Sequence, residues 1–109
     1  MINAVLYKAS VGYTGFELTG HAEWADEGED IVCAAVSSMA QFAIAGILET
    51  GKIACGYEIT EGRIYLTLPK EMTEDERFLS DHYLKTLRTM LSQMSQQYND
   101  YLKLTVMEV

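Results

Sequence analysis

A long apolar segment, residues 31–49, dominates the middle of this 109-residue chain. It is rich in alanine, and hydrophobic side chains would lie on nearly every face of the helix that it would form. Asp30 is a suitable N-cap before the segment, and Gly51 is a natural stop after it. A pattern of this kind predicts a buried helix rather than an amphipathic one at the surface.

Short strand-like segments flank this helix on both sides. Gly12 marks a turn between the two strands expected before the helix. Glu61-Gly62 is a hairpin signal between the two strands expected after the helix. The expected strands are residues 2–8, 13–19, 57–59 and 64–68, with Pro69 at a strand end and an alternating strand at 102–109.

A second helix is expected before the last strand. Thr73 and Glu76 form a capping-box pattern at its start. Its apolar residues recur at spacings of three and four, which is typical of a helix with one buried face. They are Leu79, Tyr83, Leu84, Leu87, Met90, Leu91, Met94 and Tyr98. The order ββαββαβ predicts one α+β domain over residues 1–109, with a mostly antiparallel sheet and two helices in two layers.

A histidine and a cysteine lie 12 positions apart at the start of the apolar segment, as His21 and Cys33. If Asp30 caps the helix, Cys33 is its third residue, where unpaired backbone amides and the helix dipole favour thiolate over thiol. His21 could then take the thiol proton and return it to a leaving amine. Ser37, one turn further on, could donate to the sulfur or to substrate.

Each of these residues also has a structural interpretation. Cysteines are common in protein cores, and Gly20 could be only a turn residue. Asp30 fits a cap better than a catalytic acid, and a serine in a packed helix often bonds to a carbonyl one turn earlier. The acidic stretch in residues 23–30 is either a solvated loop or a gate that attracts a basic peptide.

Charge and composition exclude several classes of function. The net charge is −8 and no basic stripe exists, so direct nucleic-acid binding is not expected. The apolar stretch 31–48 is interrupted by polar residues and is too short for a membrane span, and no signal peptide is evident, so we expect a cytoplasmic protein. No Walker loop or dinucleotide fingerprint occurs, and no cofactor is expected. The spacing of His21, Cys33, Cys55 and His82 matches no zinc signature.

The segment Gly20-His21-Ala22, together with Gly28 and the run from Asp30 to Ser37, resembles the motif of the ribosomal-processing cysteine proteases, the Prp or YsxB-like family. The resemblance extends over the whole chain in length and element order. It is strong in residues 20–37 and rests on patterning alone beyond them.

This resemblance implies a homodimeric, cytoplasmic bacterial endopeptidase. Its substrate would be the precursor of large-subunit ribosomal protein L-twenty-seven, from which it removes an N-terminal extension after a Phe-containing sequence. Cys33 would be the nucleophile and His21 the base and acid, with Gly20, Asp30 and Ser37 in support.

Two other functions are compatible with the same residues. One is a non-enzymatic, dimeric, ribosome-associated module that binds a basic ribosomal protein tail through its acidic surface, with Cys33 merely packed. The other is a thiol redox sensor, in which mild peroxide would reversibly oxidise Cys33.

Overall fold

The computed structural model describes residues 1–20 and 31–109. Within them the elements follow the predicted order ββαββαβ. In chain order they are β1 (Ile2–Ala9), β2 (Gly12–Gly20), α1 (Ile31–Ala45), the π-helical turn η1 (Gly46–Thr50), β3 (Gly56–Thr60), β4 (Arg63–Thr67), α2 (Glu74–Gln97) and β5 (Leu102–Glu108).

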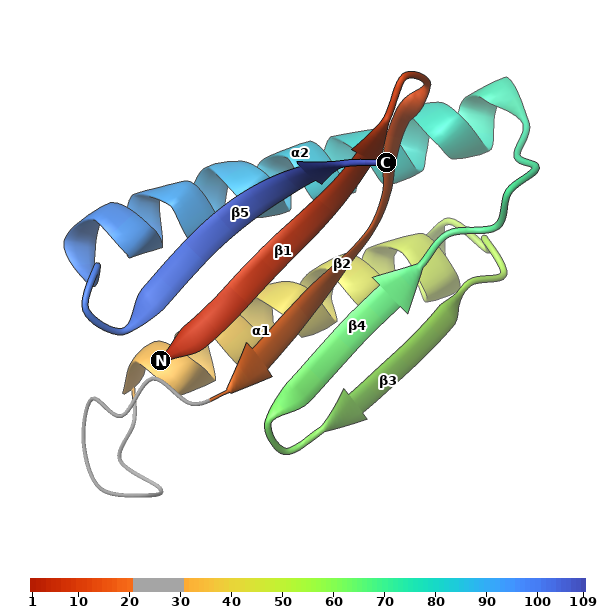
Figure 1. The fold of residues 1–109 in the computed structure, drawn as a ribbon. Coiled ribbons are helices and arrows are strands. Elements are labelled where there is room, and N and C mark those ends of the chain that lie inside the picture. Colours follow the sequence, from red (N-terminus) through yellow and green to blue (C-terminus); the bar gives the residue numbers. More distant parts are fainter. Residues whose placement is uncertain (21–30) are drawn as a thin grey trace.

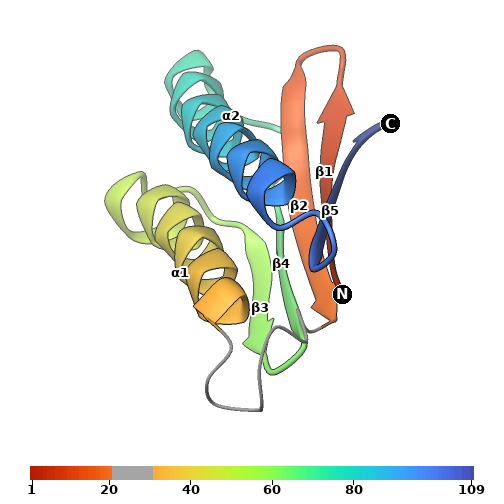
Figure 2. The same ribbon diagram turned by 90° about the vertical axis from the view of Figure 1, so that its left-hand side faces the viewer.

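The strands form one five-stranded sheet in the order β3-β4-β2-β1-β5. Among the described strands, β1 and β5 pair in parallel, and the other three pairs are antiparallel. Both helices lie on the same face of this sheet (Figures 1 and 2), with α1 over β4 and α2 over β2, β1 and β5. The predicted two-layer α+β architecture is therefore confirmed.

The core lies between the sheet and the helices. Alternation along the strands directs every second side chain toward the helices, so Ala4 and Leu6 of β1 and Phe16 of β2 are almost fully buried. From α2, Leu84, Leu87 and Leu91 fill the same layer. The predicted capping box at the start of α2 is also present: Glu76 N–H donates to Thr73 Oγ1 (3.1 Å), and Thr73 N–H donates to Glu76 Oε1 (2.9 Å).

The prediction that residues 31–49 form a helix buried on most sides is wrong. Val32, Val36 and Ala40 are buried, but Phe42 is 72% exposed and Ile31 is 58% exposed. The physical reason is the number of layers. A helix in a two-layer domain can bury only the side that faces the sheet and its neighbouring helix, whatever the composition of its outer side.

The predicted stop at Gly51 is confirmed, because Gly51 is the C-cap of the helical stretch. The helical stretch runs through η1 to Thr50, and Gly51 N–H donates to Gly46 O (2.8 Å). Gly51 itself has an ordinary right-handed backbone, and the left-handed residue is Lys52 (φ 58°). A glycine is needed at 51 for space, because a β-carbon there would contact the Leu79 side chain.

By length and composition alone, the helix Ile31–Thr50 could cross a membrane, so the expectation that this stretch is too short was wrong. The apolar composition of this helix is instead explained by its packing against the sheet. Val32, Val36, Ala43 and Ile44 belong to the same buried cluster as the strand residues, which is how the core helix of a globular domain is built.

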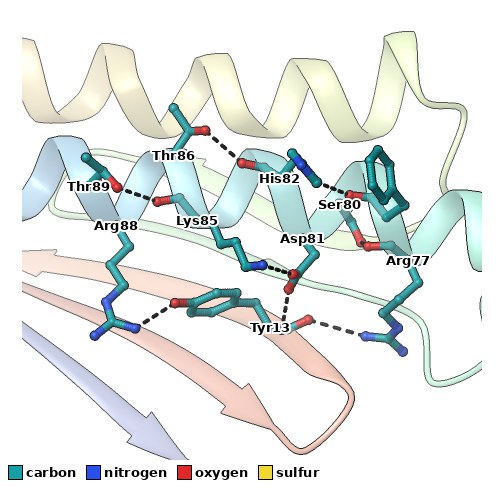
Figure 3. Close-up of polar contacts among 10 residues, drawn as sticks. Tyr13, Arg77, Ser80, Asp81, His82, Lys85, Thr86, Arg88 and Thr89 are labelled. Atoms are coloured by element: carbon teal, nitrogen blue, oxygen red, sulfur yellow. Dashed lines mark hydrogen bonds and ion pairs between the residues drawn. The ribbon is translucent and has the colours of Figure 1, made fainter.

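Polar contacts fasten α2 to the start of β2 (Figure 3). The Tyr13 backbone N–H donates to Asp81 Oδ1 (2.9 Å), and Lys85 Nζ lies 3.1 Å from Asp81 Oδ2. At the other end of the tyrosine, Arg88 donates to the Tyr13 hydroxyl (2.7 Å). These contacts hold α2 against the start of β2.

Candidate active site

Cys33 is the third residue of α1, as predicted, since the helix begins at Ile31. Its side chain is half-buried and packs against the hydrophobic core. The first-turn amides of an α-helix have no acceptor within the helix, and the helix dipole concentrates positive charge there. A thiol in this position has the surroundings that favour its ionised, nucleophilic form.

Ser37 lies one turn after Cys33 on the same side of α1 and is also half-buried. Its hydroxyl oxygen accepts a hydrogen bond from the side-chain amide of Gln41 (Nε2–Oγ, 2.9 Å). That bond occupies a lone pair of the oxygen and leaves its proton available for donation. Within the described residues, the Ser37 hydroxyl makes no hydrogen bond to a backbone carbonyl, which was the structural alternative.

Gln41 was not singled out from the sequence. The residues Cys33, Ser37 and Gln41 are spaced four apart, and this spacing places them in one row along a helix. This spacing could have indicated that Gln41 lies near Ser37. Glutamine is common on helices, however, so the spacing alone does not predict the bond.

Gly20 is the last residue of β2 and is held by its backbone. It pairs with Ile2 of β1, and its N–H donates to Gly62 O in the β3–β4 turn (3.0 Å). Its φ of +91° lies in the region that side chains avoid, and a β-carbon would collide with the Met1 carbonyl oxygen. The backbone at position 20 therefore requires a glycine.

His21 and Asp30 lie outside the described residues, as does the acidic stretch 23–30. The described part of the site consists of Gly20 at the end of β2 and Cys33 and Ser37 at the start of α1. Figure 1 has these two element ends at the same end of the molecule.

The second cysteine and the second histidine have the structural roles expected of them. Cys55 directly precedes β3 and packs against the core, and burial raises the pKa of its thiol. His82 is exposed on α2, where its Nδ1 lies 2.9 Å from Phe78 O. Among residues 1–20 and 31–109, no three His, Cys, Asp or Glu side chains are grouped as a metal site would require.

Sequence comparison finds one family over nearly the whole chain. The family model for "Cysteine protease Prp" matches residues 1–103. The chain is also 27% identical over 108 residues to the ribosomal processing cysteine protease Prp of Bacillus subtilis, covering 96% of both proteins.

Solved structures with the same fold come from two further bacteria. The S. aureus ribosomal processing protease Prp, in complex with a covalently linked product peptide, matches with a TM-score of 0.84 at 19% identity, over 97% of this chain and 99% of that one. The same enzyme with a substrate peptide matches with a TM-score of 0.79 at 18% identity, with the same coverage. A protein from Streptococcus mutans matches with a TM-score of 0.84 at 20% identity, over 100% and 99% of the two chains.

Proposed function

Because this chain belongs to the cysteine protease Prp family, we propose that it removes the N-terminal extension from the precursor of bacterial ribosomal protein L-twenty-seven. Cysteine peptidase activity follows from the family itself. The substrate is a proposal, supported by the ribosomal processing role for which the Bacillus subtilis relative is named and by the motif resemblance at residues 20–37.

The observation that carries the proposal is Cys33, a half-buried thiol in the first turn of α1. Cys55, by contrast, directly precedes a strand, and burial raises the pKa of its thiol. Both thiols are half-buried, but only Cys33 lies in the first turn of a helix, a position that favours a nucleophilic thiolate.

We assign the two chemical steps to Cys33 and His21. The Cys33 thiolate attacks the scissile carbonyl carbon, and free first-turn amides of α1 stabilise the oxyanion of the tetrahedral intermediate. Collapse breaks the carbon–nitrogen bond, His21 gives the proton to the leaving amine, and a thioester remains on Cys33. A water molecule that loses its proton to His21 then hydrolyses the thioester and releases the new carboxylate.

Three further residues are proposed to support these steps. Gly20 directs the chain toward His21, Asp30 caps α1, and the Ser37 hydroxyl donates to the sulfur or to the substrate carbonyl. The Ser37 assignment is supported by the Gln41 bond, which leaves the hydroxyl proton available.

The remaining properties are proposed from charge, composition and the resemblance. The net charge of −8 suits the lysine-rich mature end of a ribosomal protein. The protease is proposed to be a cytoplasmic homodimer. The family assignment favours this enzyme over a non-enzymatic ribosome-associated module, because such a module needs no nucleophile.

The test is cleavage of a peptide that spans the junction between extension and mature protein. We expect wild-type protein to cut one bond, as judged by mass spectrometry. Cys33→Ala and His21→Ala should lower kcat/KM by about a thousandfold or more, as removal of a nucleophile or its base does in other proteases.

Cys55→Ala is the matched control, because it removes the other thiol of the chain, and it should cleave at the wild-type rate. Intact junction peptide after prolonged incubation with folded wild-type protein would refute the proposed substrate. Undiminished cleavage by Cys33→Ala would refute the assigned nucleophile.

A further inference from the structure

We propose that the outward side of α1 binds the same side of α1 in a second copy of the chain, with the two helices antiparallel across a two-fold axis at Ser38. We call this side the outer face of α1; its exposed residues are Ile31, Ala34, Ser38, Phe42 and Ala45. The inference rests on the homodimer of the proposed function and names the surface that forms it.

The outer face of α1 is uncharged, unlike the chain as a whole. Residues 31–48 contain no Asp, Glu, Lys or Arg, although the 109 residues include 16 Asp and Glu and 8 Lys and Arg. Two large apolar side chains of this face lie in solvent, since Phe42 is 72% exposed and Ile31 is 58% exposed. A contiguous exposed apolar surface of this kind marks a site where another molecule binds.

No other element of the described part of the chain covers this face. The sheet lies against the opposite side of α1, where Val32, Val36 and Ala40 are buried. On the side toward α2, Gly46 lies close to the Tyr83 ring, because a β-carbon at position 46 would collide with it. Figure 2 shows the two helices side by side on the sheet, with no described element over them.

The neighbouring flank of α2 extends the apolar surface. The two helices run antiparallel, since Gly46 lies close to Tyr83, whereas Gly51, further along the chain, lies close to the earlier Leu79. Met90 is seven residues after Tyr83, about two helical turns, so it lies on the side of α2 that faces α1. Met90 is 42% exposed, and a partner on the outer face of α1 can contact it.

The spacing of the outer face makes it complementary to itself. Its residues recur at intervals of three and four, as in the contact stripe of two packed helices. About a two-fold axis at Ser38, positions equally far before and after residue 38 lie opposite one another in the two copies. Phe42 then lies opposite Ala34 of the second copy, and Ile31 lies opposite Ala45. Each large side chain meets a small one, so the two helices can approach closely.

The charge of the chain favours a second copy over other occupants. Each copy has a net charge of −8, so two copies repel wherever their carboxylates meet, and an uncharged face avoids this repulsion. A lysine-rich substrate would instead be attracted to acidic side chains, which this face lacks. An anionic membrane surface would be bound through lysine or arginine beside the apolar residues, and residues 31–48 contain neither.

The proposed contact adjoins the turn that carries the nucleophile. Ile31 and Ala34 flank Cys33 in the first turn of α1, and both belong to the outer face. Cys33 is five residues before Ser38, so its side chain points about 140° away from the axis, and it packs against the core. The second copy therefore holds the outside of this turn and leaves the side of the sulfur uncovered.

Disulfide trapping tests the position of the two-fold axis. In a Cys33→Ala/Cys55→Ala background, Ser38→Cys places one thiol of each copy at the axis, within the range in which a disulfide forms. We expect oxidised glutathione to convert most of this protein into a covalent dimer on non-reducing gels. Ser10→Cys in the same background is the matched control, because Ser10 is an exposed serine in the β1–β2 turn, and it should give no covalent dimer.

Phe42→Glu tests the face itself, because the two-fold axis brings a carboxylate from each copy into one contact. We expect the dimer dissociation constant, measured by sedimentation equilibrium, to rise about a hundredfold or more. Val11→Glu is the matched control; Val11 is 65% exposed in the β1–β2 turn, and this variant should keep the wild-type constant. Circular dichroism would verify that both variants are folded.

The outcomes separate this inference from the proposed function, because neither measurement depends on cleavage of the junction peptide. A dimer that survives Phe42→Glu and does not cross-link through Ser38→Cys would overturn the interface and leave the homodimer intact. Wild-type protein that is monomeric at every concentration tested would overturn both, whatever the result of the cleavage assay.

Discussion

Removal of the Asp81 carboxylate should loosen the contact between α2 and the sheet. This side chain is 18% exposed, accepts a hydrogen bond from the Tyr13 backbone N–H and pairs with Lys85. Tyr13 is 2% exposed, so its N–H has little access to water as a substitute acceptor. In Asp81→Ala the N–H loses its acceptor, whereas in Asp81→Asn a side-chain oxygen remains to accept it.

The expected losses differ in size for this reason. A buried donor left unsatisfied costs about 1–3 kcal/mol, and an exposed ion pair contributes about 0.2–1 kcal/mol. We therefore expect Asp81→Ala to lower the free energy of unfolding by about 2 kcal/mol and Tm by about 8 °C. Asp81→Asn should lose only about 0.5–1 kcal/mol, and Lys85→Ala a similar amount.

The pH dependence follows from the lowered pKa of Asp81. Burial alone would raise this pKa, but the Tyr13 hydrogen bond and Lys85 outweigh burial and lower it. A carboxyl group whose pKa is lower in the folded state stabilises the fold above its unfolded pKa of about 4. This stabilisation is lost as the pH falls through the lower folded value, so the advantage of wild type over Asp81→Asn should shrink there.

Urea denaturation at fixed protein concentration, followed by circular dichroism from pH 7 to pH 3, would measure both effects. The reasoning fails if Asp81→Ala and Asp81→Asn are equally stable at pH 7. It also fails if the difference between wild type and Asp81→Asn stays constant down to pH 3.

Two further predictions concern the site. Iodoacetamide at neutral pH should label Cys33 before Cys55, because burial raises the Cys55 pKa, and peptide mapping would measure both rates; equal slow labelling would count against a preformed nucleophile. Ser37→Ala should lower kcat about tenfold with KM and stability almost unchanged, and Gln41→Ala should lower it less, because the hydroxyl remains but loses its fixed orientation. A larger effect on KM than on kcat in either variant would contradict this assignment.

The elements of the fold were largely predictable from local signals. The capping box at Thr73 set the start of α2, Glu61-Gly62 set the β3–β4 turn, and alternation marked the strands. The exposure of α1 was not predictable, because composition does not reveal how many layers will cover a helix. Phe42 is solvent-exposed although its neighbours Ala40 and Ala43 are buried.

The candidate site divides in the same way. Cys33 at the third position of a helix follows from sequence spacing, because helix starts are encoded by nearby residues. The prediction that His21 acts on Cys33 stays a prediction, since residue 21 lies outside the described residues. The Gln41–Ser37 bond needed coordinates, because many side chains could occupy the same helix flank.

By itself, the sequence determined the type and order of the elements, the helix-start position of Cys33 and the family motif around it. These depend on contacts between residues close together in the chain. The tertiary structure alone decided that β3 is an edge strand of the described sheet and that Tyr57 and Ile59 on it are exposed, whereas their partners on β4 are buried. Strand order and helix placement depend on which distant segments pack together, and local pattern does not specify that choice.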